Sequence, residues 1–258
     1  MACLAQDDAG TVRTLRLNRP EVRNALNLEL LRALRAALAE AVSDPAVRCL
    51  LLTGEGKGFC AGADVKDWAE QGPQGGDDPW VAEAHALAVE LAEAPLPTVA
   101  LLNGAAVGAG LDLALACDFR VAADSARFAC AYTWMAYPPD VGGTWLLPRL
   151  IGVEQAKRFV FTGELWDAAT ALERGLVGEV VPLERLAERG LELGTELATG
   201  PTVAIGHAKR LLDTSHRRSL AEQLEAERIA GEACALTDDH REALAAATER
   251  REPAFRGR

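Results

Sequence analysis

The chain has 258 residues, with 27 lysines and arginines against 38 aspartates and glutamates, so its formal net charge is −11. With 49% hydrophobic and 25% charged residues, the composition is that of a globular protein and excludes wholesale disorder. The acidic balance argues against nucleic acid as a partner, because phosphate backbones bind basic surfaces.

The cysteines and histidines are scattered and predict neither a disulfide framework nor a zinc site. No Cys-x-x-Cys pair occurs among the six cysteines, so we expect reduced thiols and no metal. The N-terminus lacks the basic and apolar blocks of a signal peptide. The longest apolar stretch, 98–117, contains Asn103 and Asp112, which argues against a membrane span. We therefore expect a cytoplasmic protein with no membrane partner.

Periodicity predicts strands and helices in alternation through the first part of the chain. Residues 12–17 alternate apolar and polar side chains, and 47–52 form the apolar run of a buried strand. Residues 72–79 (GPQGGDDP) are linker-like and predict a mobile surface loop within a domain. Three segments have helical spacing or follow a glycine turn that opens a helix: 26–42, about 61–68 and 80–93.

The second part continues this alternation and then becomes helical. Strands are predicted over 98–102, 117–122 and 178–181, with an apolar helix from about Gly108. This order predicts an α/β core with parallel strands and helical crossovers. From Pro201 onward no strand signal is convincing. We therefore divide the chain into a core over 1–200 and a C-terminal helical subdomain over 201–258.

Two glycine-rich turns look alike, since each follows a buried strand and opens a helix. They are Gly58 to Asp64 (GFCAGAD) and Asn103 to Asp112 (NGAAVGAGLD). Small side chains let a ligand approach the backbone, and a helix start leaves amide N–H groups unpaired. Two such turns facing one another would form an oxyanion hole, although either turn alone is equally well explained by close helix–strand packing. The spacing matches no dinucleotide fingerprint, phosphate loop or GxSxG motif.

Further motifs accompany these turns in one order along nearly the whole chain. They are NRP at 18–20, NAL at 24–26, DVGGT at 140–144, GLV at 175–177 and REPAF at 251–255. Together with the turns they resemble the enoyl-CoA hydratase/isomerase (crotonase) superfamily. The resemblance implies a crotonase-like spiral of ββα units with a C-terminal helical trimerisation subdomain, assembled as a homotrimer or a dimer of trimers. It also implies an acyl-CoA substrate and no cofactor other than the coenzyme A of that substrate.

The resemblance also implies which groups act on the substrate. The thioester carbonyl would lie between the backbone N–H groups of Ala61 and Ala109. A helix starting near Gly108 puts Ala109 and Asp112 on one face, and Asp112 takes the position of one hydratase glutamate. The second hydratase glutamate falls at Tyr132, which is neither acid nor base at neutral pH and departs from the two-glutamate pattern.

Asp140 offers a replacement carboxylate. Its Pro-Asp-Val-Gly-Gly setting is similar to the loop that carries a catalytic aspartate in dienoyl-CoA isomerases and hydroxyisobutyryl-CoA hydrolases. Two acids in different environments can pass a proton between carbons. The leading prediction is therefore a hydratase or double-bond isomerase that stabilises a thioester enolate and moves protons with Asp112 and Asp140.

A second local similarity predicts different chemistry on the same fold. Residues 128–132 followed by Asp140 are similar to 4-chlorobenzoyl-CoA dehalogenases, whose catalytic histidine would fall at His85. Asp140 would then attack the acyl ring and His85 would activate water, giving dehalogenation or thioester hydrolysis. The simpler reading of His85 is a surface group on its helix. A third alternative is a non-catalytic acyl-CoA-binding partner that kept the fold.

Aromatic and basic residues are candidates for binding the acyl and CoA groups. Five of the thirteen aromatic residues crowd into 128–145, where they would line a pocket for a flat group or form core. By resemblance, Arg250 occupies a position from which relatives reach the CoA of a neighbouring subunit. The expected substrate-binding residues are Arg23, Ala63, Asp64, Lys66, Trp134 and Arg250.

Overall fold

The computed structural model describes residues 2–71 and 78–258, and its larger sheet contains the predicted parallel strands. Six strands pair in the order β1-β2-β3-β5-β7-β10. The β1–β2 pair is antiparallel, and the pairs that follow it are parallel. The strands are β1 (Leu4–Ala9), β2 (Val12–Leu17), β3 (Cys49–Gly54), β5 (Thr98–Leu102), β7 (Phe119–Ala123) and β10 (Glu179–Val181).

A second sheet was not predicted from the sequence. Its strands pair in the order β4-β6-β8-β9, and none of them exceeds three residues. Such short strands show no alternation, so periodicity cannot detect them. β4 and β6 are parallel, so the glycine turns that follow them leave the sheet at the same edge. The strands are β4 (Gly58–Cys60), β6 (Ala105–Val107), β8 (Arg127–Ala129) and β9 (Trp166–Asp167).

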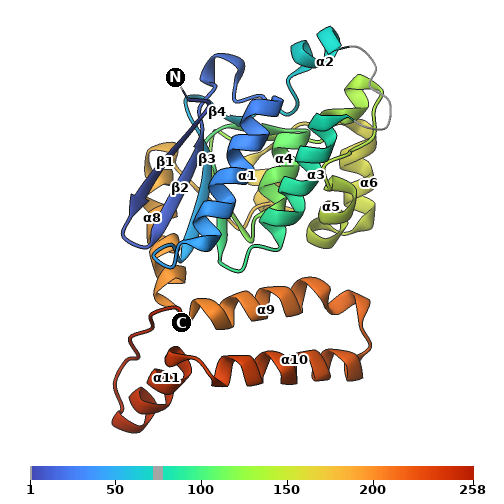
Figure 1. Cartoon of the computed structure of the whole chain (residues 1–258). Coiled ribbons are helices and arrows are strands. Elements are labelled where there is room, and N and C mark those ends of the chain that lie inside the picture. Colours follow the sequence, from blue (N-terminus) through green and yellow to red (C-terminus); the bar gives the residue numbers. More distant parts are fainter. Residues whose placement is uncertain (1, 72–77) are drawn as a thin grey trace.

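Helices cover both faces of the larger sheet. α1 (Leu28–Ser43), α3 (Pro79–Ala92) and α4 (Ala109–Ala116) lie side by side on one face, and α8 (Leu186–Thr199) covers the other (Figure 1). The core accordingly forms two clusters of buried apolar side chains, one on each face. α1 begins later than predicted because the Asn27 side chain accepts the Leu30 N–H and caps the helix there.

One predicted helix starts in the wrong place. α2 (Val65–Gln71) begins after Asp64 and not near Ala61, because residues 61–64 are not helical and Ala63 forms a β-bridge with Leu26. The loop predicted over 72–79 lies mostly outside the described residues. Its last two residues open α3: the Asp78 carboxylate accepts the Trp80 N–H at 2.8 Å, and Pro79 occupies the first turn.

The C-terminal part is helical, as predicted. α9 (Thr202–Thr214) and α10 (Leu220–Ala235) run antiparallel beside the core, and α11 (Asp238–Glu249) turns back near the C-terminus (Figure 1). Lys209 on α9 ties this region to the core by an ion pair of 3.0 Å with Asp118. Among the described helices, none combines the length and apolar character that crossing a bilayer would need. The remaining helices are α5 (Gly143–Ile151), α6 (Val153–Thr162) and α7 (Ala168–Glu173).

Candidate active site

The two glycine turns meet because they follow adjacent parallel strands. Gly62 has a φ of 95°, and a Cβ built on it would lie 2.9 Å from the Val107 carbonyl oxygen and 3.6 Å from the Ala109 nitrogen. A Cβ on Gly110 would lie 2.6 Å from both the carbonyl oxygen and the sulfur of Cys60. Side chains larger than hydrogen therefore do not fit at this contact, and the turns face one another as predicted.

The second turn presents the Ala109 N–H as a donor. Ala109 is the first residue of α4, and such a residue has no acceptor within its own helix. The turn depends on Gly108, whose φ of 52° and ψ of −127° are essentially restricted to glycine. Ala109 itself keeps a negative φ, so alanine serves as well as glycine here.

In the first turn, the prediction that Ala61 supplies the other donor is wrong. The Ala61 N–H donates to the carbonyl oxygen of Arg23 at 3.0 Å. A donor already held by the protein backbone is not available to a substrate oxygen. The sequence did not reveal this bond, because Arg23 lies far away along the chain with a left-handed φ of 55°.

Ala63, expected among the substrate contacts, has the orientation that Ala61 lacks. It forms a parallel β-bridge with Leu26, in which the Leu26 N–H donates to the Gly62 oxygen at 2.8 Å and the Asp64 N–H donates to the Leu26 oxygen at 3.0 Å. Successive N–H groups of an extended segment point to opposite sides. The Ala63 N–H therefore points away from Leu26, and it is the available partner of Ala109.

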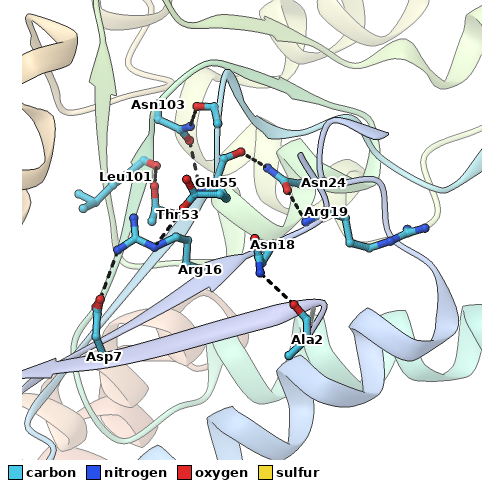
Figure 2. A network of polar contacts seen from close by, with 12 residues as sticks. Ala2, Asp7, Arg16, Asn18, Arg19, Asn24, Thr53, Glu55, Leu101 and Asn103 are labelled. Atoms are coloured by element: carbon cyan, nitrogen blue, oxygen red, sulfur yellow. Dashed lines mark hydrogen bonds and ion pairs between the residues drawn. The ribbon is translucent and has the colours of Figure 1, made fainter. Parts of the chain in front are cut away.

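Two asparagines hold the loop that leads into β4. The buried Asn24 side chain donates to the Glu55 carbonyl oxygen at 3.0 Å (Figure 2). The Asn103 side chain donates to the Gly56 oxygen at 3.0 Å and accepts the Gly54 N–H at 3.3 Å. Asn24 precedes the first donor turn and Asn103 begins the second. Because both side chains bind the backbone of residues 54–56, both turns are linked to the same loop. The sequence analysis included these asparagines in its motifs but predicted no role for them.

Asp112 is buried on α4, one helical turn after Ala109. The Tyr132 hydroxyl donates to its Oδ2 at 2.6 Å, while Oδ1 is buried without a hydrogen-bond partner among the described residues. A Cβ on Gly143 would clash with Oδ1, so the site requires glycine there. Burial raises the pKa of Asp112 to about 7, and the Asp140 charge adds to the rise. Asp112 can therefore hold a proton near neutral pH.

Asp140 is half-buried in the loop that precedes α5. Its Oδ2 is enclosed and has no hydrogen-bond partner among the described residues. Burial raises the pKa of Asp140, and the nearby His85 opposes this rise. Burial and the charges of both aspartates raise the pKa of Tyr132 well above its usual value. The two carboxyls and the phenol are thus electrostatically coupled, and Tyr132 stays protonated at neutral pH, as expected.

His85 meets Asp140 through the backbone. The His85 Nε2 lies 2.6 Å from the Asp140 main-chain oxygen, and the imidazole is exposed on α3. The two residues of the dehalogenase-like prediction therefore lie close together, although the contact involves the Asp140 backbone and not its carboxylate. A role of His85 in activating water stays a prediction, since the contact seen here holds the loop.

The residues expected to bind substrate near the first turn fall into two groups. Arg23 and Lys66 are exposed on either side of the turn and are available to an anionic group. The Asp64 carboxylate instead pairs with Arg19 at 3.0 Å, and the two side chains are only 9% and 17% exposed. The charge of Asp64 is therefore used within the protein.

The other two expected contacts lie elsewhere. Trp134 is exposed, and its indole lies against Gly163 at the end of α6, where a Cβ would clash with the ring. Arg250 follows α11, which is at the opposite end of the molecule from β4 in Figure 1. Within one chain the structure therefore does not bring Arg250 to the glycine turns.

The predicted cluster of aromatic residues over 128–145 separates in space. Phe128 is core, and Trp145 packs against His216 at 5.6 Å. Tyr137 instead packs edge-to-face on Trp68 of α2 at 5.3 Å, and Trp68 lies 6.4 Å from Trp80 of α3. We call these three residues, Trp68, Trp80 and Tyr137, the aromatic cluster.

The arrangement suits a reaction that develops negative charge on a carbonyl oxygen. Two backbone donors, Ala63 and Ala109, are fixed in advance, and buried carboxyls lie beside the second one. Fixed donors of this kind stabilise an oxyanion, because they need no reorganisation as the charge forms. Over residues 2–71 and 78–258, no three histidine, cysteine or acidic side chains come together as a metal site.

Comparison with known proteins agrees with this chemistry. The family model described as enoyl-CoA hydratase/isomerase matches residues 7–258. The 1,2-epoxyphenylacetyl-CoA isomerase of Escherichia coli is 38% identical over 256 residues, covering 96% of this chain and 95% of that protein. The crystal structure of an enoyl-CoA hydratase from Bacillus anthracis superposes with a TM-score of 0.93 at 36% identity, covering 99% of this chain and 100% of that one. The chain therefore belongs to the enoyl-CoA hydratase/isomerase family of enzymes and has the crotonase fold.

Proposed function

We propose that the protein isomerises a carbon–carbon double bond in an acyl-CoA thioester. The Asp140 carboxylate removes a proton from one carbon, and the electron pair moves onto the thioester oxygen to give an enolate. The Ala63 and Ala109 N–H groups hold that oxygen. Asp140 then returns the same proton to a different carbon, or Asp112 delivers its proton there and is reprotonated by the one that Asp140 took. In either case the reaction is balanced without any further reactant.

The observation that carries this proposal is the enclosed, unpartnered Oδ2 of Asp140. A buried polar atom without a partner is costly and calls for an explanation such as a catalytic role. Burial also raises the pKa of this carboxyl, which makes it a stronger base once ionised. Its charge contributes to the raised pKa values of Tyr132 and Asp112, which supports a position near the α4 donor turn.

The position of Tyr132 favours isomerisation over hydration. Hydration needs a group that activates water and a group that donates a proton. A protonated phenol bound to Asp112 at 2.6 Å cannot act as that base. One free carboxylate acting on one substrate is sufficient for a proton transfer between carbons.

We also propose that the acyl group carries a ring. The aromatic cluster lies close in sequence to the proposed donor and to the proposed base: Trp68 follows Ala63, and Tyr137 precedes Asp140. Aromatic side chains bind planar groups by stacking or edge contacts. The name of the Escherichia coli relative, a 1,2-epoxyphenylacetyl-CoA isomerase, supports the same substrate class.

We propose that copies of the chain associate through the C-terminal helices, as a homotrimer or a dimer of trimers. Leu212, Leu220 and Leu236 are 73%, 75% and 79% exposed on this part of the chain. Exposed leucines on neighbouring helices are typical of a surface that another subunit covers. Sedimentation of the protein at a single-chain mass would contradict this.

Asp140→Asn is the decisive variant, because it keeps the shape of the side chain and removes the base. We expect kcat for interconversion of 2-enoyl and 3-enoyl CoA esters with a phenyl-bearing acyl group to fall about 10³-fold. KM should change little. Asp124→Asn, at an exposed aspartate, is the matched control and should retain full activity. Full turnover by Asp140→Asn would overturn the proposal.

The dehalogenase or hydrolase alternative gives a different result in the same assay. Single turnover of 4-chlorobenzoyl-CoA would leave an aryl ester on Asp140, which mass spectrometry of the intact protein detects. Such an adduct, with resolution slowed by His85→Gln, would replace the isomerase proposal.

A further inference from the structure

We propose that Trp80 is a positioning residue for the oxyanion hole: its indole N–H fixes the backbone that presents the Ala63 amide. The inference rests on the proposed function, because it gives a purpose to a tryptophan that touches none of the proton-transfer groups. It concerns how the donor is held in place and does not concern the proton transfer itself.

The contact is a buried hydrogen bond to the residue that faces Ala63 across the bridge. Trp80 Nε1 donates to the Leu26 carbonyl oxygen at 2.8 Å. Trp80 is 8% exposed and Leu26 is fully buried. The same oxygen accepts the Asp64 N–H at 3.0 Å. A carbonyl oxygen has two lone pairs, so both acceptor sites of Leu26 are occupied and its peptide group is fixed.

The bridge needs this support because it is isolated. Leu26 and Ala63 form a single β-bridge outside the strands of either sheet. A strand in a sheet is held by many hydrogen bonds along its length. Here the two hydrogen bonds that flank Ala63, at Gly62 and at Asp64, both involve Leu26. If the Leu26 backbone shifted, its N–H bond to Gly62 and its carbonyl bond from Asp64 would shift with it, and the Ala63 N–H would change direction.

A second tie acts on the same segment from the other side. The Arg19 guanidinium donates to the Ala25 carbonyl oxygen at 2.6 Å and to the Asp64 carboxylate at 3.0 Å. Arg19 therefore holds the residue before Leu26 and the residue after Ala63. Trp80 holds the peptide between them, and the position of the Ala63 amide is determined from both sides.

Trp80 is itself well anchored. It lies in the first turn of α3, where its N–H donates to the Asp78 side chain at 2.8 Å. Its ring belongs to the aromatic cluster through Trp68. The indole thus joins the start of α3 to the donor turn. Phenylalanine could not replace it, because phenylalanine has no N–H to donate to Leu26.

The test is Trp80→Phe, which keeps an aromatic ring and removes the donor. Trp166→Phe is the matched control, because Trp166 is also buried and donates its indole N–H at 2.9 Å, but to Glu164. The probe is phenylacetyl-CoA labelled with carbon-13 at the thioester carbonyl. Two quantities are measured: the infrared frequency of the bound carbonyl, and the rate at which the α-protons exchange with deuterated water.

We expect the carbonyl band of the wild-type complex to lie below that of the free ester. In Trp80→Phe it should move back towards the free value, and α-proton exchange should slow about 10-fold. KM should change less than about 2-fold, and the control should match the wild type. A merely structural role would lower the melting temperature without moving the carbonyl band.

A folded Trp80→Phe protein with the wild-type band and exchange rate would overturn the inference. If Trp80→Phe does not fold, benzothienylalanine at position 80 keeps the shape of the indole and replaces only its N–H by sulfur. A shifted carbonyl band with slower exchange would again support the inference, and wild-type values of both would overturn it. A wild-type protein that shifts no carbonyl band would instead contradict the proposed function, and the inference with it.

Discussion

The two donor turns resemble one another in sequence and are supported in different ways. The second turn is fixed locally, because Ala109 starts a helix and Gly108 sets the entry angle. The first turn is fixed at a distance, because Ala63 depends on Leu26, Arg19 and Trp80. Similar glycine-rich stretches can therefore present the same amide group through different interactions. Only support that comes from neighbouring residues can be recognised from the sequence of the turn itself.

The aspartates that end the two turns also have different surroundings. Asp64 is paired with the Arg19 cation. Asp112 is buried against a phenol, and burial raises its pKa to about 7. One carboxylate is thus part of an ion pair that holds the backbone, whereas the other can hold a proton near neutral pH.

Among the variants that compare the two turns, the largest effect is expected from adding a methyl group where they touch. In Gly110→Ala the new Cβ would lie 2.6 Å from backbone and side-chain atoms of Cys60, so β4 and α4 must separate. We expect catalytic turnover to fall about 10²-fold or more, because displacement of one donor by 1 Å costs that much. Overpacking should also lower the free energy of unfolding by about 1–3 kcal/mol.

Gly231→Ala on α10 is the control, since a Cβ there meets nothing within 4 Å. Alanine favours a helix interior over glycine, so this variant should gain about 0.5–1 kcal/mol and keep its activity. Chemical denaturation and steady-state kinetics measure both. Full activity in Gly110→Ala would show that the turns need not touch.

A smaller effect, with a defined pH dependence, is expected at the two aspartates. Between about pH 4 and pH 7, folded Asp112 holds a proton that the unfolded chain has released, so this residue lowers the stability as the pH rises through that window. Above pH 7 its contribution is constant. Asp112→Asn removes the dependence and should be more stable than the wild type by about 4 kcal/mol at pH 8, at about 1.36 kcal/mol for each unit by which the pKa of Asp112 is raised. At pH 4 the two proteins should be nearly equal.

Asp64→Asn is the matched comparison and should show the opposite sign. It leaves the largely buried Arg19 without its anion, so we expect a loss of about 1–3 kcal/mol at pH 8. Urea denaturation across this pH range measures both variants. A stabilising Asp64→Asn, or an Asp112→Asn difference that does not grow with pH, would show that the two carboxylates are not distinguished as described.

The sequence predicted the features that depend on neighbouring residues. The strands over 12–17 and 98–102 have the predicted bounds, because their apolar pattern is long enough to be read. Ala109 and Asp112 were placed correctly relative to one another, because a helix start fixes that spacing. The helical C-terminal region was predicted because no strand signal is convincing after Pro201.

The missed features depend on contacts between distant parts of the chain. Ala61 was chosen over Ala63 because nothing within the turn shows that Arg23 occupies the first amide and that Leu26 orients the second. The small sheet was missed because its strands are too short for a pattern. β1 was missed because five of its six residues are exposed and show no alternation.

A crystal structure of the protein with a bound acyl-CoA tests the central claim most directly. If Ala63 and Ala109 form the oxyanion hole, the thioester oxygen will lie within about 3.1 Å of both backbone nitrogens. It will also place an acyl carbon next to the Asp140 carboxylate. A thioester oxygen bound elsewhere, or one that displaces Arg23 to reach the Ala61 nitrogen, would contradict the account.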